Sequence, residues 1–320
     1  MNTFVAFSRW QFELMNTLIQ ISRLTSWRGT TKTAVLSSNQ TDEEQEMKLQ
    51  KMLLVPVALI LSLTTNPQKL HAQTTPSARV YQQMTQSERS EFVASQARRI
   101  ASEMSGKDYE FTPAFIEDIQ QAVNQYTRRL GKAGDTSLGK RDLRLVFERG
   151  QAQAPTLIAA FKARNVSPLI GLYIPWVESE YQNIQTPNSM GAIGMFQFVP
   201  KTGERYGLSA VDLLDVGKSA DAAARYITDS LDQFKGDPMK EALALLAYNR
   251  GGQQSARDLK FLINDQNKQC SICALTADRN KLDASFQNES VYYVPRFFAA
   301  AIIGENPGAF GLKMNALSSY

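Results

Sequence analysis

A single glutamate at the end of an apolar stretch is the residue best placed in this sequence for acid–base chemistry. Glu178 follows the apolar run 169–175 by three residues. A carboxyl at the end of such a run is partly removed from water, and desolvation disfavours its charged form. The pKa of a glutamate, ordinarily about 4.3, then rises toward roughly 6 to 7, where the group can donate a proton at neutral pH. Glu178 is therefore the candidate general acid, and an ordinary carboxylate at a frayed helix end is the competing interpretation.

The next carboxylate along the chain, Glu180, does not complete a catalytic pair. Two residues on a helix differ by about 200° in direction, so Glu180 cannot face the same site as Glu178. Most glycosidases use two facing carboxylates, but some let the acetamido group of the substrate take the second role. The sequence shows only the second arrangement.

The scarcity of histidine and cysteine excludes several kinds of catalysis. The only histidine, His71, lies in a segment that we expect to be removed, which takes away the imidazole that Ser-His-Asp and Cys-His enzymes need. Zinc sites generally draw on several His or Cys ligands, so we expect no metal and no cofactor. Cys270 and Cys273 would close a small disulfide or act as a redox pair in an oxidising compartment. We favour the structural disulfide.

Two segments downstream of Glu178 carry polar residues among glycines. Residues 189–198 read Ser-Met-Gly-Ala-Ile-Gly-Met-Phe-Gln-Phe, and residues 247–252 read Ala-Tyr-Asn-Arg-Gly-Gly. With Glu178-Ser179 they resemble the three signatures of the lytic transglycosylase catalytic domain: Glu-Ser, Gly-Ala-x-Gly-x-x-Gln and Ala-Tyr-Asn-x-Gly. Each motif alone is weakly specific, whereas all three in this order form a specific pattern.

The resemblance extends over roughly residues 140 to 300 and is closest to the membrane-bound lytic murein transglycosylase D branch. Residues 197–208 and 221–226 resemble that branch, and residues 289–296 are similar to the family's late Glu-Thr-x-x-Tyr-Val segment. Phe196 stands where the branch usually has tryptophan, and Ser290 replaces the threonine. These two departures affect the details of substrate binding.

The resemblance implies a lysozyme-like helical fold and an enzyme that cleaves peptidoglycan without water. The bond cut would be the β-1,4 linkage between N-acetylmuramic acid and N-acetylglucosamine, with Glu178 as general acid and then base and a 1,6-anhydromuramoyl end as product. The same resemblance implies substrate-binding roles for four more residues: Ser189 and Gln197 at the acetamido and peptide-proximal groups, Tyr248 at the developing cation or the acetamido group, and Glu289 along the groove.

Structural roles compete with each of these assignments. Gly191 and Gly194 would allow a tight backbone path, Tyr248 would pack in the core, and Gln197 would cap a backbone group. Asn249 precedes Gly251 at a helix end, and we expect it to be structural. The aromatic residues 176, 196 and 206 are more typical of a core than of sugar stacking.

Two other functions remain open at this stage. The first is a hydrolase of the goose-type lysozyme class, which is similar in fold and in its central glutamate and differs only in its product. The second is a catalytically inactive cell-wall-binding protein, against which the presence of Glu178 argues.

The elements that position these residues are helices. Apolar residues recur at three- and four-residue intervals over these ranges: 85–105, 113–130, 141–149, 155–165, 168–181, 219–234 and 238–249. One strand-like run covers 195–199. The fold class is therefore mainly α, and the resemblance implies a lysozyme-like helical catalytic domain (161–320) with a short β-like segment, preceded by a helical N-terminal region (73–160).

Residues 47–72 are typical of a targeting segment. Residues 52–63 are apolar but far shorter than the roughly 20 residues that span a bilayer, and Lys48 and Lys51 precede them. We interpret 47–72 as a signal peptide that ends at Ala72, and 1–46 as an upstream extension. A long leader or an internal anchor is the alternative. No cysteine stands directly after the run, where a lipoprotein signal would need one, so we expect an exported protein of the periplasm or cell envelope that is not a lipoprotein.

The charge pattern does not favour nucleic acid as a partner. The formal net charge is +4, and basic residues form only short pairs such as Arg98-Arg99 and Arg128-Arg129, without the concentrated basic face of nucleic-acid-binding proteins. The expected partner is the peptidoglycan glycan strand, with membrane contact only through an uncleaved signal segment. The sequence indicates no protein partner.

Overall fold

The computed structural model describes residues 79–131, 142–264 and 266–320. The predicted upstream extension (1–46) and the predicted signal peptide (47–72) lie outside the described residues. The described residues belong to one compact unit. None of their helices has the length and apolarity needed to cross a membrane.

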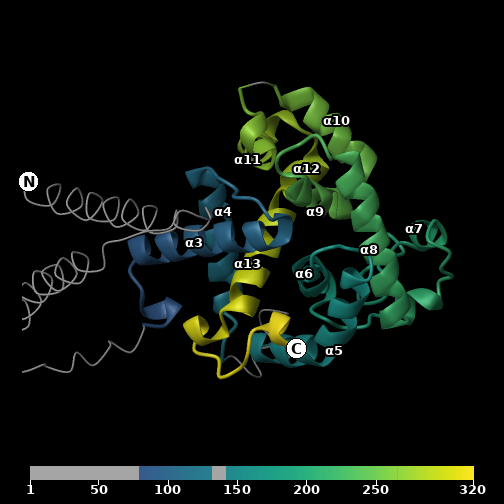
Figure 1. Cartoon of the computed structure of the whole chain (residues 1–320), viewed down its shortest axis with the longest axis horizontal. Coiled ribbons are helices and arrows are strands. Elements are labelled where there is room, and N and C mark those ends of the chain that lie inside the picture. The colour runs from purple at the N-terminus through teal and green to yellow at the C-terminus, as the bar shows by residue number, and fades with distance from the viewer. Residues whose placement is uncertain (1–78, 132–141, 265) are drawn as a thin grey trace, which may run out of the picture. The chain divides into compact units, whose positions relative to one another are not determined.

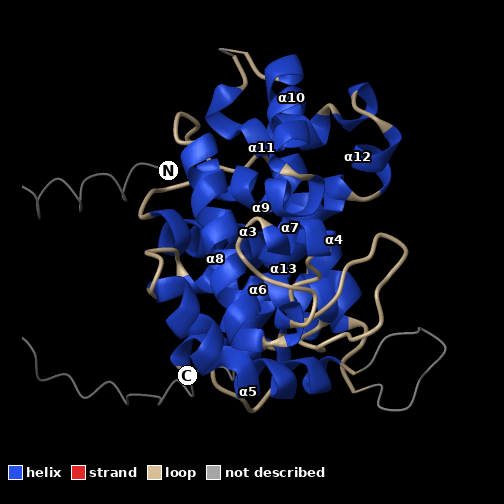
Figure 2. Cartoon of the chain, turned by 90° about the vertical axis from the view of Figure 1, so that its right-hand side faces the viewer, coloured by secondary structure: helices blue, strands red, loops and turns tan. Residues whose placement is uncertain are grey.

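The described chain is built from helices, with no strand among the residues described (Figure 2). The α-helices are α3 (Gln86–Ser105), α4 (Pro113–Thr127), α5 (Leu143–Lys162), α6 (Pro168–Ser179), α7 (Pro200–Glu204), α8 (Val216–Gln233), α9 (Lys240–Arg250), α10 (Gly252–Leu262), α11 (Ser271–Ala277), α12 (Ala284–Asn288) and α13 (Tyr293–Glu305). Short 3₁₀ turns connect them: η1 (Tyr81–Gln83), η3 (Asp212–Leu214), η4 (Lys268–Cys270), η5 (Arg279–Lys281), η6 (Ser290–Tyr292), η7 (Pro307–Phe310) and η8 (Leu317–Ser319). The mainly α fold class is confirmed.

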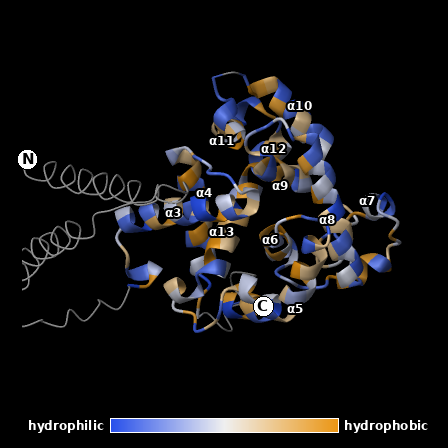
Figure 3. Cartoon of the chain, in the orientation of Figure 1, coloured by the Kyte–Doolittle hydropathy of each residue, from blue (hydrophilic) through white to orange (hydrophobic). Residues whose placement is uncertain are grey.

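Helix α13 forms the centre of the packing. Almost every one of its side chains is buried, as expected for a helix that is apolar all round. It packs against α3, α4, α6 and α9 (Figure 1). Figure 3 shows hydrophobic residues concentrated on α13 and α6, while α3 carries hydrophilic residues beside its apolar ones. This packing brings the start of α13 to the end of α6, where Glu178 lies.

Side-chain bonds tie the N-terminal helices to the rest of the unit. Arg129 pairs with Glu180, and the hydroxyl of Tyr109 donates to the buried carboxylate of Glu241. The backbone N–H of Thr112 lies 3.4 Å from Sγ of Cys273, which is joined to Cys270 in a disulfide. The predicted structural disulfide is present, and residues before 160 pack directly on those after it.

Several predicted boundaries shift by a few residues because of local capping. Helix α3 begins at Gln86, one residue later than predicted, because Thr85 caps it and forms a capping box with Glu88. Helix α8 begins at Val216 behind an Asp215 cap, three residues earlier than predicted. Helix α9 begins at Lys240, because Asp237 accepts a bond from Met239 N (2.8 Å) in a turn outside the helix. Thr112 and Pro113 start α4 as predicted.

Two predictions about elements were wrong. The helices expected at 141–149 and 155–165 are one helix, α5, with Pro155 inside it. Proline disfavours a helix interior but does not forbid it, and the buried face of α5 continues across the proline from Ala154 to Leu157. The predicted division at 160/161 therefore falls inside α5 and stays a prediction about where the catalytic sequence begins. The run 195–199 is not a strand: only its Phe198 takes part in an isolated antiparallel bridge, with Ile193, and a second such bridge joins Ile184 to Gly194 just before the run.

Candidate active site

Glu178 lies in the last turn of α6 and is bound by a tyrosine of α13, a helix that is distant in sequence. Its Oε1 accepts a hydrogen bond of 2.7 Å from the hydroxyl of Tyr293, the first residue of α13. Glu178 is half-buried and Tyr293 is buried. No described residue bonds to the second oxygen, Oε2, which leaves it available to a substrate.

The surroundings of Glu178 change its acidity in the direction that the sequence predicts. Burial raises the pKa of Glu178 from its ordinary 4.5 to about 7. The hydrogen bond from Tyr293 opposes this change because it stabilises the charged form, whereas the negative charge of Glu289 adds to it. Desolvation is the largest effect. A carboxyl with a pKa near neutrality can both donate a proton and take one back.

Glu180 is bound by two arginines and is not a second catalytic acid. Its carboxylate accepts bonds of 2.6 and 2.9 Å from Arg129, and Arg149 Nε donates to its backbone oxygen at 2.7 Å. Glu180 and Tyr181 both have left-handed backbones, with φ of 54° and 59°, which is unfavourable for residues with a Cβ. The ion pairs stabilise this turn, which ends α6 directly after Glu178. The prediction that Glu178 and Glu180 form no dyad is confirmed.

Ser179 attaches the glycine-containing loop 188–198 to the end of α6. Its Oγ donates to the backbone oxygen of Met195 at 2.7 Å. Gly194 has φ of +77°, and a Cβ there would lie 2.3 Å from the backbone oxygen of Leu213, so only glycine fits. Gln197, also left-handed at φ 51°, donates from Nε2 to Gly194 O at 2.7 Å. The tight backbone path predicted at Gly194 is confirmed, and the amide nitrogen of Gln197 has the predicted structural role.

Tyr248 connects this loop to α9. Its hydroxyl donates to the backbone oxygen of Phe196 at 3.0 Å, and its ring lies edge-on to Phe198 and Tyr226, with centroids 5.8 and 5.3 Å apart. Burial raises the pKa of Tyr248, and the charge of Glu178 raises it further. Tyr248 is therefore close enough to Glu178 to be affected by its charge. The phenol of Tyr248 stays protonated, as a neutral hydrogen-bonding group.

Glu289, the first residue of the late segment 289–296, is bound to Asn249 in the last turn of α9. Glu289 is exposed, and its Oε1 accepts a bond of 3.3 Å from Asn249 Nδ2. The charge of Glu289 also acts on Glu178, so Glu289 lies beside the candidate acid. Asn249, which we expected to be structural, borders the site through this bond, and its buried Oδ1 has no partner among the described residues.

The structure organises the tip of the loop around Asn188 and not around the predicted Ser189. Asn188 Oδ1 accepts bonds from Met190 N at 2.9 Å and Ala192 N at 3.0 Å, a turn geometry that asparagine favours. Ser189 is exposed beside it and bonds to no other described residue. Its binding role stays a prediction.

The aromatic residues 176, 196 and 206 make structural contacts. Trp176 and Phe196 are fully buried, and Phe196 stacks on Phe161 with centroids 6.4 Å apart. The hydroxyl of Tyr206 donates to Asp229 Oδ2 at 2.8 Å. Phe196, where the resembled branch has tryptophan, therefore belongs to the core under the loop.

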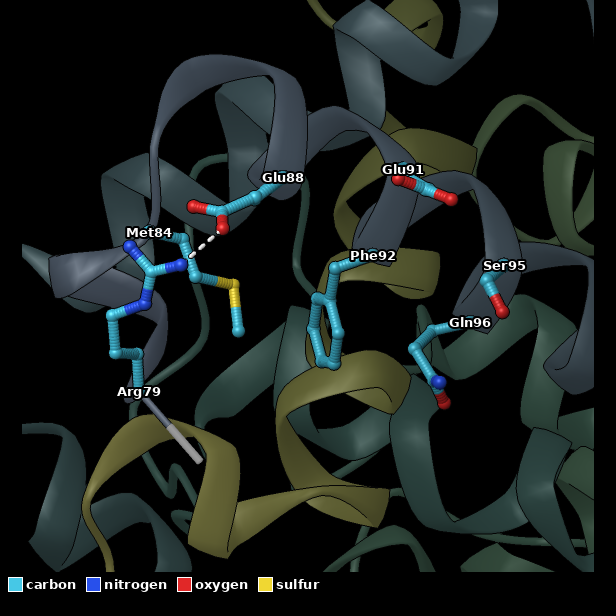
Figure 4. Close-up of a pocket in the computed structure, with 7 residues that line it drawn as sticks. All are labelled: Arg79, Met84, Glu88, Glu91, Phe92, Ser95 and Gln96. Carbon is cyan, nitrogen blue, oxygen red and sulfur yellow. Dashed lines mark hydrogen bonds and ion pairs between the residues drawn. The ribbon is translucent and has the colours of Figure 1, made fainter. Parts of the chain in front are cut away.

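A pocket on α3 is lined by two other carboxyls but lacks the electrostatics of a proton donor. Glu88 and Glu91 line it with Phe92 (Figure 4). Glu88 pairs with Arg79, and hydrogen bonds from Thr85 lower the pKa of Glu88. Its pKa thus moves in the opposite direction from that of Glu178. Among the described residues, no group of three or more His, Cys, Asp or Glu is arranged to hold a metal.

Comparison with known families agrees with the grouping around Glu178. Residues 155–268 match the Transglycosylase SLT domain. The SLT match contains Glu178, Ser189, Gln197 and Tyr248 and ends before Glu289. It supports an enzyme of the lytic transglycosylase type with peptidoglycan as its substrate. A search of curated proteins finds no match.

The contact that sequence reasoning missed is Tyr293 on Glu178. Tyr293 lies outside the SLT match and 115 residues from Glu178. It is the tyrosine of the late segment 289–296, which is the signal that could have identified it. Asn188 was missed as well, although an asparagine shortly before a glycine is a turn signal that could have identified it.

Proposed function

We propose that this protein is a peptidoglycan lytic transglycosylase that forms 1,6-anhydro-N-acetylmuramic acid ends, with Glu178 as both acid and base. The observation that carries the proposal is the half-buried carboxyl of Glu178, whose pKa of about 7 suits proton transfer in both directions. The SLT match supports the substrate class.

The proposed reaction needs one carboxyl and no water. Glu178 gives its proton to the glycosidic oxygen as the bond to C1 of N-acetylmuramic acid breaks, and the acetamido oxygen of that sugar supports the positive charge at C1. The Glu178 carboxylate then takes the proton of the C6 hydroxyl as O6 bonds to C1. The proton that left Glu178 stays on the released N-acetylglucosamine, and the C6 proton restores the acid.

The neighbours of Glu178 suit supporting roles in this scheme. Tyr293 orients the carboxyl through Oε1 and leaves Oε2 for the glycosidic oxygen. Tyr248 stays neutral beside Glu178 and would contact the acetamido group, with Ser189 and Gln197 on the facing loop. The similarity to the murein transglycosylase D branch and the export to the periplasm or cell envelope belong to the same proposal.

The test is the nature of the cut ends released from purified sacculi. The wild type is expected to release muropeptides with anhydro ends by mass spectrometry. The Glu178→Gln variant keeps a side chain that can accept the Tyr293 bond and is expected to lose at least about 100-fold in rate. Reducing N-acetylmuramic acid ends without anhydro ends would establish a hydrolase of the goose-type lysozyme class. Full activity of Glu178→Gln would show that the site is wrong.

A further inference from the structure

Arg296 lies one turn beyond Tyr293 on helix α13. Residues three apart on a helix lie on the same face, with Cβ atoms about 5–6 Å apart, so Arg296 neighbours Tyr293, which bonds to Glu178. The electrostatics agree with this placement. Burial raises the pKa of Tyr126, and the positive charge of Arg296 opposes that rise, while Tyr126 also acts on Tyr293. Arg296 therefore lies near Tyr126 and one helical turn from the tyrosine that binds the candidate acid.

Arg296 is exposed and has no acidic partner. No described residue forms an ion pair or hydrogen bond with its guanidinium; its contact is with the ring of Tyr292, whose centroid lies 5.7 Å from Cζ. Tyr292 is itself 40% exposed. Other arginines of the unit are bound to carboxylates, Arg129 to Glu180 and Arg250 to Asp258 among them. The guanidinium of Arg296 is thus supported on one side by an aromatic ring and is open to a ligand.

We propose that Arg296, supported by Tyr292, binds a carboxylate of the muramoyl substituent of the substrate. A guanidinium matches a carboxylate in geometry and charge. Each N-acetylmuramic acid carries a lactyl group that ends either in a carboxylate or in a peptide stem with free carboxylates, whereas N-acetylglucosamine carries none. An anchor one helical turn from the Tyr293–Glu178 pair would place the muramic acid, and not its neighbour, with C1 beside the acid. This inference rests on the proposed function for its substrate.

Removal of the Arg296 side chain should not disturb the fold. An exposed cation–π contact is worth roughly 0.5–1 kcal/mol, and the side chain of Arg296 makes no other bond to the described residues. A change in substrate affinity on substitution would therefore report lost binding and not unfolding. Arg98, an exposed arginine on α3 without a partner among the described residues, provides a matched control for the loss of one positive charge.

The test measures equilibrium binding in the Glu178→Gln background, in which turnover does not consume the substrate. Dissociation constants for soluble peptidoglycan strands are compared among Glu178→Gln alone and its combinations with Arg296→Gln, Arg296→Lys and Arg98→Gln. The strands are used intact, with their carboxylates converted to amides, or stripped of peptide by an amidase. Arg296→Gln is expected to weaken binding to intact strands about 10-fold, Arg296→Lys less, and Arg98→Gln not measurably. Amidation should weaken the parent and leave the Arg296→Gln combination unchanged.

The stripped strands identify which carboxylate is bound. If the difference between parent and Arg296→Gln disappears on them, Arg296 binds only a carboxylate of the stem peptide; if it persists, Arg296 also binds the lactyl carboxylate that the amidase frees. Equal binding by parent and Arg296→Gln, or equal weakening of both by amidation, would overturn the inference. The proposed function fails separately, if the wild type releases reducing instead of anhydro ends.

Discussion

Glu178, Glu180 and Glu88 are three carboxylates whose roles are decided by their neighbours. Glu180 is paired with Arg129, and Glu88 accepts backbone and side-chain bonds that lower its pKa. Glu178 is partly withdrawn from water and has a like charge beside it, so its pKa rises to about 7. The Tyr293 bond and the Glu289 charge act on that pKa in opposite directions.

The two neighbours of Glu178 are expected to shift the pH profile in opposite directions. Tyr293→Phe removes a bond that stabilises the charged form, so the pKa of Glu178 rises and activity persists to higher pH. Glu289→Gln removes a like charge, so the pKa falls and activity is lost at lower pH. The pH dependence of kcat/KM on soluble glycan strands checks this. Shifts in the same direction would contradict the account, and a loss of several orders of magnitude in Glu289→Gln would indicate that Glu289 is a second catalytic carboxylate.

The raised pKa also predicts how stability depends on pH. A carboxyl whose pKa is higher in the folded state contributes stability below the unfolded pKa and loses that contribution as pH rises through the folded value. For Glu178 this window runs from about 4.5 to about 7. Glu178→Gln should therefore unfold at the same temperature as the wild type at pH 4 and be more stable at pH 8, by up to about 3 kcal/mol. Thermal unfolding at both pH values checks this, and a difference that does not grow with pH would rule out a desolvated carboxyl.

At the scale of elements, the site is the meeting point of the end of α6, the loop 188–198, the end of α9 and the start of α13. The loop is fixed by backbone geometry as well as by side-chain bonds. Gly194 lies against Leu213 O, whereas the nearest atom to a Cβ at Gly191 is 4.0 Å away. Both glycines have positive φ, +80° at Gly191 and +77° at Gly194.

These two glycines make a matched pair of substitutions. Gly191→Ala should cost only the left-handed backbone penalty, about 1–2 kcal/mol. Gly194→Ala adds a collision with backbone and should cost about 3 kcal/mol or more, with loss of activity because the bond from Gln197 to Gly194 O shifts. Chemical denaturation and sacculus digestion measure both effects. Equal costs at the two positions would show that the loop is not held against Leu213.

Helix positions and the candidate acid could be predicted from sequence because they depend on local patterns. The apolar run before Glu178 predicted its desolvation, and Thr112-Pro113 predicted the start of α4. The continuation of α5 through Pro155 could not be predicted, because tertiary burial of its face overrides a local penalty. The contact of Tyr293 with Glu178 depends on how α13 packs on α6, which no local pattern specifies.

At the scale of the whole molecule, the helices before α5 belong to the same unit as the candidate active site. Helices α3 and α4 cover α13, and Arg129 supplies the charge that binds Glu180 at the turn after Glu178. A fragment of residues 161–320 would expose the apolar side of α13, leave Glu180 without Arg129 and cut α5.

We therefore expect the fragment 161–320 to lack a cooperative unfolding transition, whereas a fragment of residues 79–320 unfolds cooperatively. Circular dichroism melting curves of the two fragments check this. A cooperative transition in the shorter fragment, with retained cleavage of sacculi, would show instead that residues 161–320 form an independent domain.

The most direct test of the central claim is digestion of sacculi in water labelled with heavy oxygen. If Glu178 acts alone as acid and base and the C6 hydroxyl closes the ring, the released muramic acid ends carry no label and are lighter by one water than reducing ends. Incorporation of labelled oxygen at C1 of those ends at the moment of cleavage would contradict the account.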